Sequence, residues 1–435
     1  MLRPVAMDCS RSLRRKKLTV AVQDMKRKRS RRWPKRCRRY GNCLSASASS
    51  RGKRRREARP ASKAMAGSIR KVSAASARAH TRKKTHADSF FLPRGMIKKL
   101  SVVLFIGLVA WSYQAIQPTP PKICGSPDGP PVTSSRIKLK DGRHLAYTET
   151  GVPKEKAKYK IVFIHGFNCC KFDVIPISPA LLEELGIYLL SFDRAGYGES
   201  DPHPKMTEKS TALDIEELAD KLELGSKFYI IGFSMGGEIG WTCLKFIPHR
   251  LAGAAIVAPV ANYWWRGFPS NLSKEAYNQQ FLQDKWAVGI AHYAPWLTYW
   301  WNTQKLFPGS SVISQRVDGF SAEDLKLFPK FAARGYQAQI RQQGEFESIH
   351  RDMMVNFGHW DFSPLELDNP FPNNEGSVHL WHGAEDLIVP VILSRYISQK
   401  LPWVHYHELP DAGHLFPLAD GMSDAIVKAL LLGDH

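Results

Sequence analysis

A serine flanked by glycines is the first feature of this sequence that could carry chemistry. The motif GFSMGG at residues 232–237 follows an apolar run of strand length, Phe228–Gly232, and precedes a stretch with helical periodicity. A GxSxG pattern alone is weak, but at a strand-to-helix turn its small residues permit a sharp bend that exposes the serine hydroxyl. The hydroxyl also lies at the positive, N-terminal end of the helix. The spacing therefore predicts that Ser234 is a nucleophile.

A serine hydroxyl is a poor nucleophile until a base takes its proton. Among the 15 histidines, His414 ends the polar loop Asp411–His414, directly after a predicted strand, and Gly413 lets the backbone turn there. We predict that His414 is the base. His405 and His407 alternate along the preceding strand, where packing or solvation is the ordinary role of a histidine.

The imidazole of such a base needs a carboxylate that fixes its tautomer and stabilises the imidazolium. Glu385 and Asp386 follow the apolar run Val378–Trp381 and so lie at the same strand-end edge as the serine and the histidine. We predict that Asp386 is this carboxylate and that Glu385 faces solvent. The chain order serine, aspartate, histidine is that of nucleophile-elbow enzymes and differs from two other serine-protease orders.

The negative charge that develops on a carbonyl oxygen needs hydrogen-bond donors. Residues His165–Phe167 follow another apolar run, so the backbone N–H of Phe167 can join that of Met235 to form an oxyanion hole. His165 itself is predicted to be structural. None of the seven cysteines forms a CxxC pair, so we expect no metal site and no cofactor. The vicinal pair Cys169-Cys170 could tune or oxidise the site, although packing is its simpler role.

Strands must bring these residues together. From about residue 135 onward, apolar runs alternate with amphipathic stretches, which predicts an α/β fold with a largely parallel sheet covered by helices on both faces. Between Val260 and Glu375 the alternation fails, and 22 of these 116 residues are aromatic. This segment is predicted to be a helical insertion. The predicted buried strands are Lys160–His165, Ile187–Asp193, Phe228–Gly232, Ala254–Ala258, Val378–Trp381 and Val404–Leu409.

Charge divides the chain into two parts. Residues 1–100 hold 32 Lys and Arg against 4 Asp and Glu, whereas residues 101–435 hold 30 against 36, a net charge of −6. Residues 1–95 show no apolar periodicity and are predicted to be a disordered basic extension. A nucleic-acid or nuclear-import tract, an organelle-targeting extension and an extension without function are its competing interpretations. Because the surplus charge is confined to this extension, we do not expect the body to bind nucleic acid.

An apolar run of about 12–17 residues follows Lys98 and Lys99 and ends before Pro118. A methionine, two lysines and such a run are typical of a secretory signal or a signal-anchor. Seventeen helical residues span about 26 Å, against a hydrocarbon core of about 30 Å. We expect residues 96–117 to be an uncleaved anchor that crosses the membrane through residues 97–116. A buried core helix is the alternative, and cleavage after Ser112 is disfavoured by a poor small-residue signal.

The positive charge before this segment predicts that the body lies on the lumenal side, in the secretory pathway or endoplasmic reticulum. The remaining boundaries predicted from the sequence are a Pro-rich linker at residues 118–134 and a catalytic body at residues 135–435.

From about residue 135 to the end, the chain resembles the α/β-hydrolase superfamily. Five motifs occur in its order: His165–Phe167, FDRAGYGES at 192–200, the serine motif, GAED at 383–386 with Val389-Pro390, and Gly413-His414. The resemblance implies an eight-stranded, mostly parallel sheet with helices on both faces and a lid formed by residues 260–375. The anchor and the sequence PPKICGSP at 120–127 look like the membrane-anchored plant members.

The resemblance implies a serine hydrolase that cleaves a carboxylic ester or related acyl bond of a small or lipid-like molecule through an acyl-enzyme. Epoxide hydrolases and haloalkane dehalogenases of this superfamily use an aspartate at the elbow, so Ser234 argues against both activities. Two alternatives stay open: a ligand receptor of the same fold with little turnover, and an acyltransferase. Oligomeric state and substrate identity do not follow from the sequence.

Overall fold

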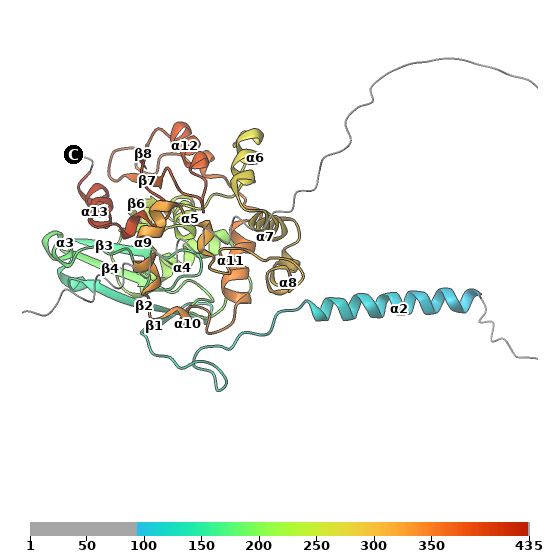
Figure 1. Ribbon diagram of the computed structural model, residues 1–435. Coiled ribbons are helices and arrows are strands. Elements are labelled where there is room, and N and C mark those ends of the chain that lie inside the picture. Colours follow the sequence, from blue (N-terminus) through green and yellow to red (C-terminus); the bar gives the residue numbers. More distant parts are fainter. Residues whose placement is uncertain (1–93, 434–435) are drawn as a thin grey trace, which may run out of the picture. The chain divides into compact units, whose positions relative to one another are not determined.

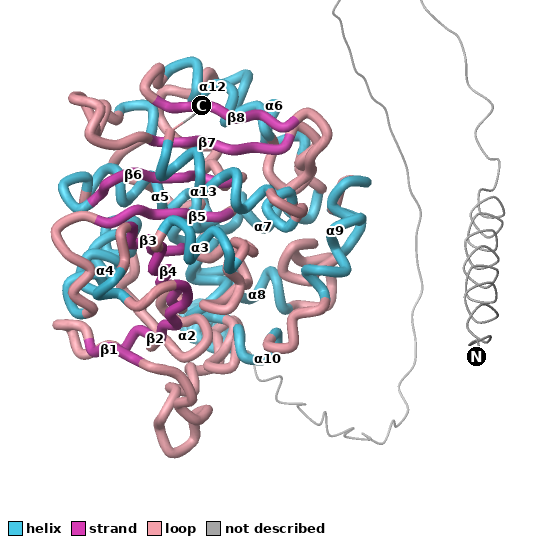
Figure 2. Tube along the Cα trace, turned by 90° about the vertical axis from the view of Figure 1, so that its left-hand side faces the viewer, coloured by secondary structure: helices cyan, strands magenta, loops and turns pink. Residues whose placement is uncertain are grey.

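The computed structural model describes residues 94–433, which form an eight-stranded sheet with helices on both faces (Figure 1). The strand order is β1-β2-β4-β3-β5-β6-β7-β8, and Figure 2 shows the strands in succession across the sheet. The β1–β2 and β2–β4 pairs are antiparallel and all other neighbouring pairs are parallel. The predicted fold class is confirmed. The strands are β1 (Arg136–Lys138), β2 (His144–Gly151), β3 (Tyr159–Ile164), β4 (Ile187–Phe192), β5 (Phe228–Phe233), β6 (Leu251–Val257), β7 (Val378–Gly383) and β8 (Val404–Leu409).

Side chains of the buried strands alternate between two hydrophobic cores, as the pleat of a strand requires. In β3, Val162 and Ile164 belong to one core, whereas Ile161 and Phe163 belong to the other. Both faces of the sheet are therefore covered, which explains why these strands are continuous apolar runs. The first core contains helices α4 (Glu208–Lys221), α5 (Met235–Phe246) and α12 (Val391–Lys400), and the second contains α3 (Pro179–Leu185) and α13 (Met422–Leu432).

Residues between β6 and β7 form helices and turns and contribute no strand in the described chain. Two of these helices pack on the body near the nucleophile motif: α7 and α11 share a small apolar core with Met235. The helices are α6 (Ser270–Gln279), α7 (Leu282–Tyr293), α8 (Thr298–Thr303), α9 (Ala322–Ala332), α10 (Gln337–Ile340) and α11 (Arg351–Asn356), with a π-helical turn at Phe346–His350.

Helix α2 (Arg94–Ala115) contains a segment, Gly95–Ala115, that is long and apolar enough to cross a bilayer. Residues 95–115 are exposed in the structure. A signal sequence meets the same criteria of length and composition. The basic extension predicted at residues 1–95 lies outside the described residues, apart from Arg94 and Gly95.

Candidate active site

Ser234 lies at a sharp turn between β5 and α5 with backbone angles of φ 56° and ψ −119°. Such angles are costly for a residue with a side chain and persist only where the surroundings impose them. Two glycines permit the turn. A Cβ atom on Gly232 would lie 2.2 Å from the carbonyl oxygen of Gly236, and one on Gly236 would lie 2.0 Å from that of Ile164. The sequence motif therefore folds into the predicted strand-turn-helix.

The structure brings Ser234, His414 and Asp386 into one hydrogen-bonded chain. Nε2 of His414 lies 3.0 Å from Oγ of Ser234, and Nδ1 of His414 lies 2.6 Å from Oδ2 of Asp386. The side chains come from loops that follow β5, β7 and β8, which are neighbours in the sheet apart from the intervening β6. All three residues are buried. This arrangement allows His414 to accept the serine proton while Asp386 holds the ring.

Asp386 is held as a carboxylate by four donors. Its Oδ1 accepts the N–H groups of Ile388 and Val389 at 2.9 and 2.8 Å, and its Oδ2 faces His414 and, at 3.3 Å, Nε2 of His382. Burial by itself raises the pKa of Asp386, but the charge and hydrogen bonds of the two histidines outweigh burial and hold that pKa well below its usual range. The carboxylate is therefore ionised at neutral pH.

The interaction with Asp386 shifts the pKa of His414 in the opposite direction. Burial disfavours the charged ring, but the Asp386 carboxylate outweighs burial and raises the pKa of His414 above its usual value. A raised pKa makes the imidazole a stronger base for the serine proton.

His382 stands in the motif region at the end of β7, but the sequence alone suggested no role for it. Its Nε2 faces the carbonyl of Val389 at 3.1 Å as well as Asp386, and its Nδ1 lies 2.9 Å from Oγ of Ser394. These partners assign the proton to Nε2, with Nδ1 accepting from the Ser394 hydroxyl. His382 therefore holds the Asp386 loop through contacts with the Asp386 carboxylate and the Val389 carbonyl. Only its position three residues before Glu385 could have pointed to it.

The predicted oxyanion donors lie beside the serine. A Cβ atom on Gly166 would lie 3.1 Å from Cβ of Ser234, so the loop that carries Phe167 passes directly against the nucleophile. Met235 is the first residue of α5, and its N–H is one of the amides that a helix leaves without an internal partner. Within the described chain, neither the Phe167 nor the Met235 N–H donates to a protein acceptor. Both are available to an oxygen of a substrate.

Arg194 holds the loop that carries Phe167 through hydrogen bonds to its backbone. Its guanidinium donates to the carbonyl oxygens of His165 and Gly166, both at 3.1 Å, and forms two hydrogen bonds with Asp352 of α11. The His165 ring accepts the Arg194 N–H at 3.0 Å and is buried, and burial holds its pKa well below the usual value. His165 thus has the structural role predicted for it. The partner role of Asp352 was not predicted, because nothing in the local sequence marks a residue 158 positions from Arg194.

Two other predicted features can be placed. Glu385 is exposed, as expected. Cys169 and Cys170 are buried free thiols, and burial raises the pKa of Cys169 to about 12. A thiol with this pKa is protonated and unreactive at neutral pH.

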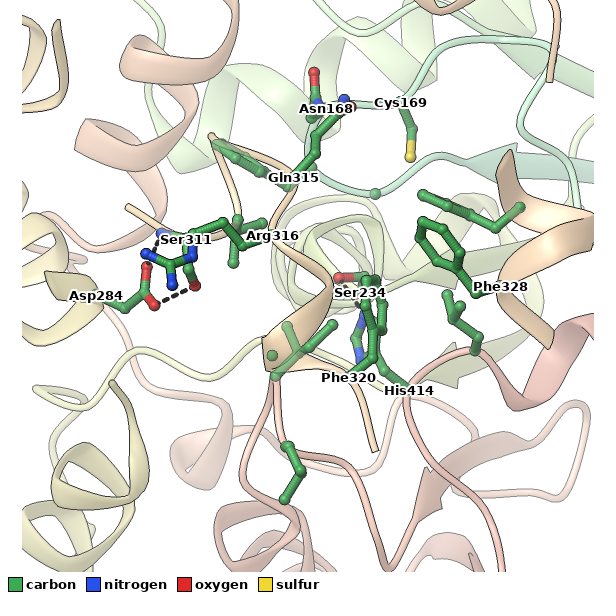
Figure 3. Close-up of a pocket in the computed structure, with 18 of the residues that line it drawn as sticks. Asn168, Cys169, Ser234, Asp284, Ser311, Gln315, Arg316, Phe320, Phe328 and His414 are labelled. Atoms are coloured by element: carbon green, nitrogen blue, oxygen red, sulfur yellow. Dashed lines mark hydrogen bonds between the residues drawn. The ribbon is translucent and has the colours of Figure 1, made fainter. Parts of the chain in front are cut away.

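A cavity opens beside Ser234 and has two parts that share lining residues; Figure 3 shows the first part. We name the first part the outer chamber; it has a volume of about 150 Å³. The second part, the inner chamber, has a volume of about 80 Å³. The outer chamber is lined by Phe281, Phe320, Phe328, Phe331 and His414, and the inner chamber by Met235, Val288, Met353, Phe357 and Leu393.

Three curated proteins show the range of sequence similarity. Bifunctional epoxide hydrolase 2 of Sus scrofa is 30% identical over 139 residues, which are 31% of this chain and 23% of the relative. The hydrolase YugF of Bacillus subtilis (strain 168), itself uncharacterized, is 20% identical over 277 residues, 64% of this chain and 90% of the relative. Probable lysophospholipase BODYGUARD 2 of Arabidopsis thaliana is 21% identical over 284 residues, 63% and 58% of the two chains. The chain thus spans less than a quarter of the Sus scrofa protein.

Solved structures are similar over about two thirds of this chain. The enol-lactonase from Burkholderia xenovorans LB400 matches with a TM-score of 0.49 and 18% identity over 69% of this chain and 99% of its own. A thermophilic esterase from Thermogutta terrifontis matches with a TM-score of 0.45 and 19% identity over 69% and 100%. The family model described as alpha/beta hydrolase fold matches residues 159–420, more than half of the chain. The chain therefore belongs to the α/β-hydrolase family.

Proposed function

We propose that this protein is a serine hydrolase that cleaves a carboxylic ester or a related acyl bond of a small or lipid-like molecule. The observation that supports the proposal is the hydrogen-bonded chain from Oγ of Ser234 through His414 to Asp386, with links of 3.0 and 2.6 Å. A serine in such a chain attacks carbonyl carbon and forms an acyl-enzyme.

In the first half of the reaction, Oγ of Ser234 bonds to the carbonyl carbon of the ester as its proton passes to Nε2 of His414. The oxyanion accepts the N–H groups of Phe167 and Met235. The carbon–oxygen bond to the alcohol then breaks, and the alcohol leaves with the proton from His414. The carboxylate of Asp386 stabilises the imidazolium of His414 by an ion pair throughout these steps.

In the second half, a water gives one proton to Nε2 of His414 and its oxygen bonds to the acyl carbon. The bond between that carbon and Oγ of Ser234 breaks, Oγ takes the proton back from His414, and the acid is released. The sum is one ester and one water consumed, with one acid and one alcohol formed. Neither half needs a cofactor.

A fluorophosphonate probe tests the nucleophile. We expect the wild-type protein to form a covalent adduct whose mass lies on the peptide that contains Ser234. The Ser234→Ala variant should form no adduct, whereas Ser398→Ala, which changes a half-buried serine on α12, should be labelled as the wild type is. Equal labelling of Ser234→Ala, or no labelling of the wild type, would show the proposal to be wrong.

Turnover then separates hydrolysis from the two alternatives. Release of acid from short esters supports a hydrolase. A labelled protein that binds ligands but releases no product would favour a receptor of this fold. A new ester product on addition of an alcohol would favour acyl transfer.

The setting of this reaction is also a proposal. Residues 96–117 anchor the protein in a membrane of the secretory pathway or endoplasmic reticulum, as in membrane-anchored plant members, and the body faces the lumen, with residues 260–375 as a lid. The apolar helix α2 and the similarity to BODYGUARD 2 support this view. The full-length protein should stay in the membrane fraction during alkaline carbonate extraction. Deleting residues 1–117 should release the protein, and deleting residues 1–95 should not.

A further inference from the structure

We propose that the two chambers hold the two halves of the substrate: a short acyl group without a negative charge in the inner chamber and a larger, apolar or aromatic alcohol in the outer chamber. The inference rests on the serine hydrolase function proposed above and specifies its substrate class. It follows from the position of His414, the burial of the walls, the two volumes and the charges that line them.

Ser234 lies where the chambers meet. Ser234, Phe167 and Ile388 line both chambers, so a carbonyl placed at Ser234 has one substituent in each. Phe167 is also one of the two proposed oxyanion donors. The carbonyl oxygen therefore has its site at this junction, and the two substituents of the carbonyl carbon extend away from it.

His414 decides which substituent is which. It lines the outer chamber together with its neighbour Leu415, and neither residue lines the inner chamber. The departing alcohol oxygen must take a proton from Nε2 of His414, so this oxygen has to lie on the His414 side. Met235, an oxyanion donor, lines only the inner chamber. The alcohol therefore extends into the outer chamber and the acyl group into the inner one.

The walls of the chambers agree with this assignment. Those of the inner chamber belong to the protein core: Met235, Met353 and Leu393 are all buried. In the outer chamber, Phe281 and Leu387 are exposed to 40% and 54%. Phe281 and Leu387 thus give the alcohol half a border toward solvent, where the first product can leave. Packed side chains form part of the wall around the acyl half, and Val312, itself partly exposed, borders both chambers.

The volumes set the size of each half. One water takes about 10–15 Å³ on the scale of these volumes, so the inner chamber accepts about five to eight non-hydrogen atoms and the outer about 10–15. The inner chamber therefore fits an acyl chain of about five to eight carbons. Phenylalanine rings at 281, 320 and 328 in the outer chamber favour a ring or another broad apolar group.

Charge limits the acyl half further. Asp284 lines both chambers, and its carboxylate accepts the N–H of Ser311 and the hydroxyl of Ser310, both at 2.8 Å. Of the described residues that line the inner chamber, none is Lys or Arg, whereas Arg316 lines the outer chamber. An acyl group with its own carboxylate would meet the Asp284 carboxylate in a chamber that Arg316 does not line, although Arg316 interacts electrostatically with Asp284 from the outer chamber. The acyl group is therefore not an anion.

The full chain in detergent, assayed with two matched ester series, tests the proposal. In the first series, 2-(1-naphthyl)ethyl esters carry acyl chains from acetyl to palmitoyl, with glutaryl as the charged member. We expect kcat/KM to peak between five and eight carbons, to fall at least 10-fold for palmitoyl, and to be at least 10-fold lower for glutaryl than for pentanoyl. In the second series, 2-(1-naphthyl)ethyl butyrate should exceed ethyl butyrate at least 10-fold, although both alcohols are similar leaving groups.

Two variants assign the chambers. Phe357→Ala enlarges the inner chamber, so the acyl optimum should move to longer chains while the preference between the two alcohols stays the same. Phe328→Ala should lower the preference for the naphthyl alcohol and leave the acyl optimum in place. The opposite pattern, or a fastest reaction with palmitoyl in the wild type, would overturn the assignment. The wild-type series decides the question even if Phe357→Ala does not fold.

The outcomes separate this inference from the function on which it rests. A protein that labels at Ser234 but hydrolyses palmitoyl esters fastest refutes the chambers alone. A protein that neither labels nor hydrolyses refutes both. If the protein labels without turnover, the labelling rates of butyl- and hexadecylphosphonyl fluoridates decide: a faster reaction with the butyl probe supports the inner chamber, and a faster reaction with the hexadecyl probe refutes it.

Discussion

Arg194 and Asp352 form a buried, bidentate ion pair between the loop after β4 and helix α11. The distances are 2.5 Å from Nη1 to Oδ1 and 2.7 Å from Nη2 to Oδ2, and both side chains are less than a tenth exposed. The same guanidinium donates to the carbonyls of His165 and Gly166, at the base of the loop that carries Phe167. A helix of the insertion is thus tied directly to the backbone that carries the proposed oxyanion donor Phe167.

We predict that Asp352→Ala lowers kcat about 10-fold and changes KM by less than about twofold, because a displaced Phe167 N–H weakens contact with the oxyanion rather than with the ground state. The free energy of unfolding should fall by about 3–5 kcal/mol, since a buried guanidinium loses its partner. Steady-state kinetics and urea unfolding measure both effects. Asp220→Ala, which removes an exposed partner of Arg250, should cost less than about 1 kcal/mol and leave kcat unchanged. A rise in KM as large as the expected fall in kcat would contradict the proposal that Asp352 positions the Phe167 loop.

The pH dependence of catalysis should report His414. The base works only when neutral, so kcat/KM should fall as the pH drops below the pKa of His414, which Asp386 raises above the usual value of about 6.5. Asp386→Asn removes that carboxylate, so burial prevails and the inflection moves to lower pH. The loss of orientation should also reduce kcat by about 10,000-fold. The exposed neighbour Glu385 gives the control, because Glu385→Gln should keep the wild-type pH profile. A shifted profile in Glu385→Gln would contradict the assignment of Asp386 as the carboxylate that pairs with His414.

His382 is predicted to act through Asp386. His382→Ala removes one donor to Oδ2 of Asp386 and leaves the Ser394 hydroxyl without its ring partner, so the Asp386 loop should loosen. We expect kcat to fall about 10-fold with a modest loss of stability of about 1–3 kcal/mol. A donor in the same place should restore part of kcat, so His382→Gln serves as the rescue. His249→Ala, at an exposed pair with Glu216, should have no effect on kcat. Full activity in His382→Ala would contradict the role.

Two glycines of α5 should respond in opposite ways to alanine. In Gly236→Ala the new Cβ would lie 2.0 Å from the Ile164 carbonyl oxygen, so the nucleophile turn must shift. We expect activity to fall at least about 100-fold and stability to drop by about 1–3 kcal/mol. In Gly240→Ala the nearest atom, on Ile256, would be 3.4 Å away. A helical alanine there should be neutral or stabilise by about 0.5–1 kcal/mol with activity retained. Thermal unfolding and ester hydrolysis compare the pair, and a tolerated Gly236→Ala would argue against a rigid turn.

The fold and the proximity of Ser234, Asp386 and His414 could be predicted from the sequence because each depends on a local pattern. Apolar runs of strand length mark the buried strands, and polar loops after them carry the three side chains. In a parallel sheet the carboxyl ends of the strands meet at one edge, so residues far apart in the chain are brought together by topology alone. The order of motifs was therefore sufficient to place them.

Asp352, His382 and the two chambers were decided by tertiary structure. Asp352 meets Arg194 only because α11 packs against the body, and His382 meets Asp386 only because the loop after β7 folds back over the strand. The division of the cavity depends on which side chains of residues 260–375 reach Ser234, and aromatic composition does not specify this. Periodicity and spacing determine which residues leave a strand at one edge, whereas packing between distant segments determines which of them touch and what space is left for a substrate.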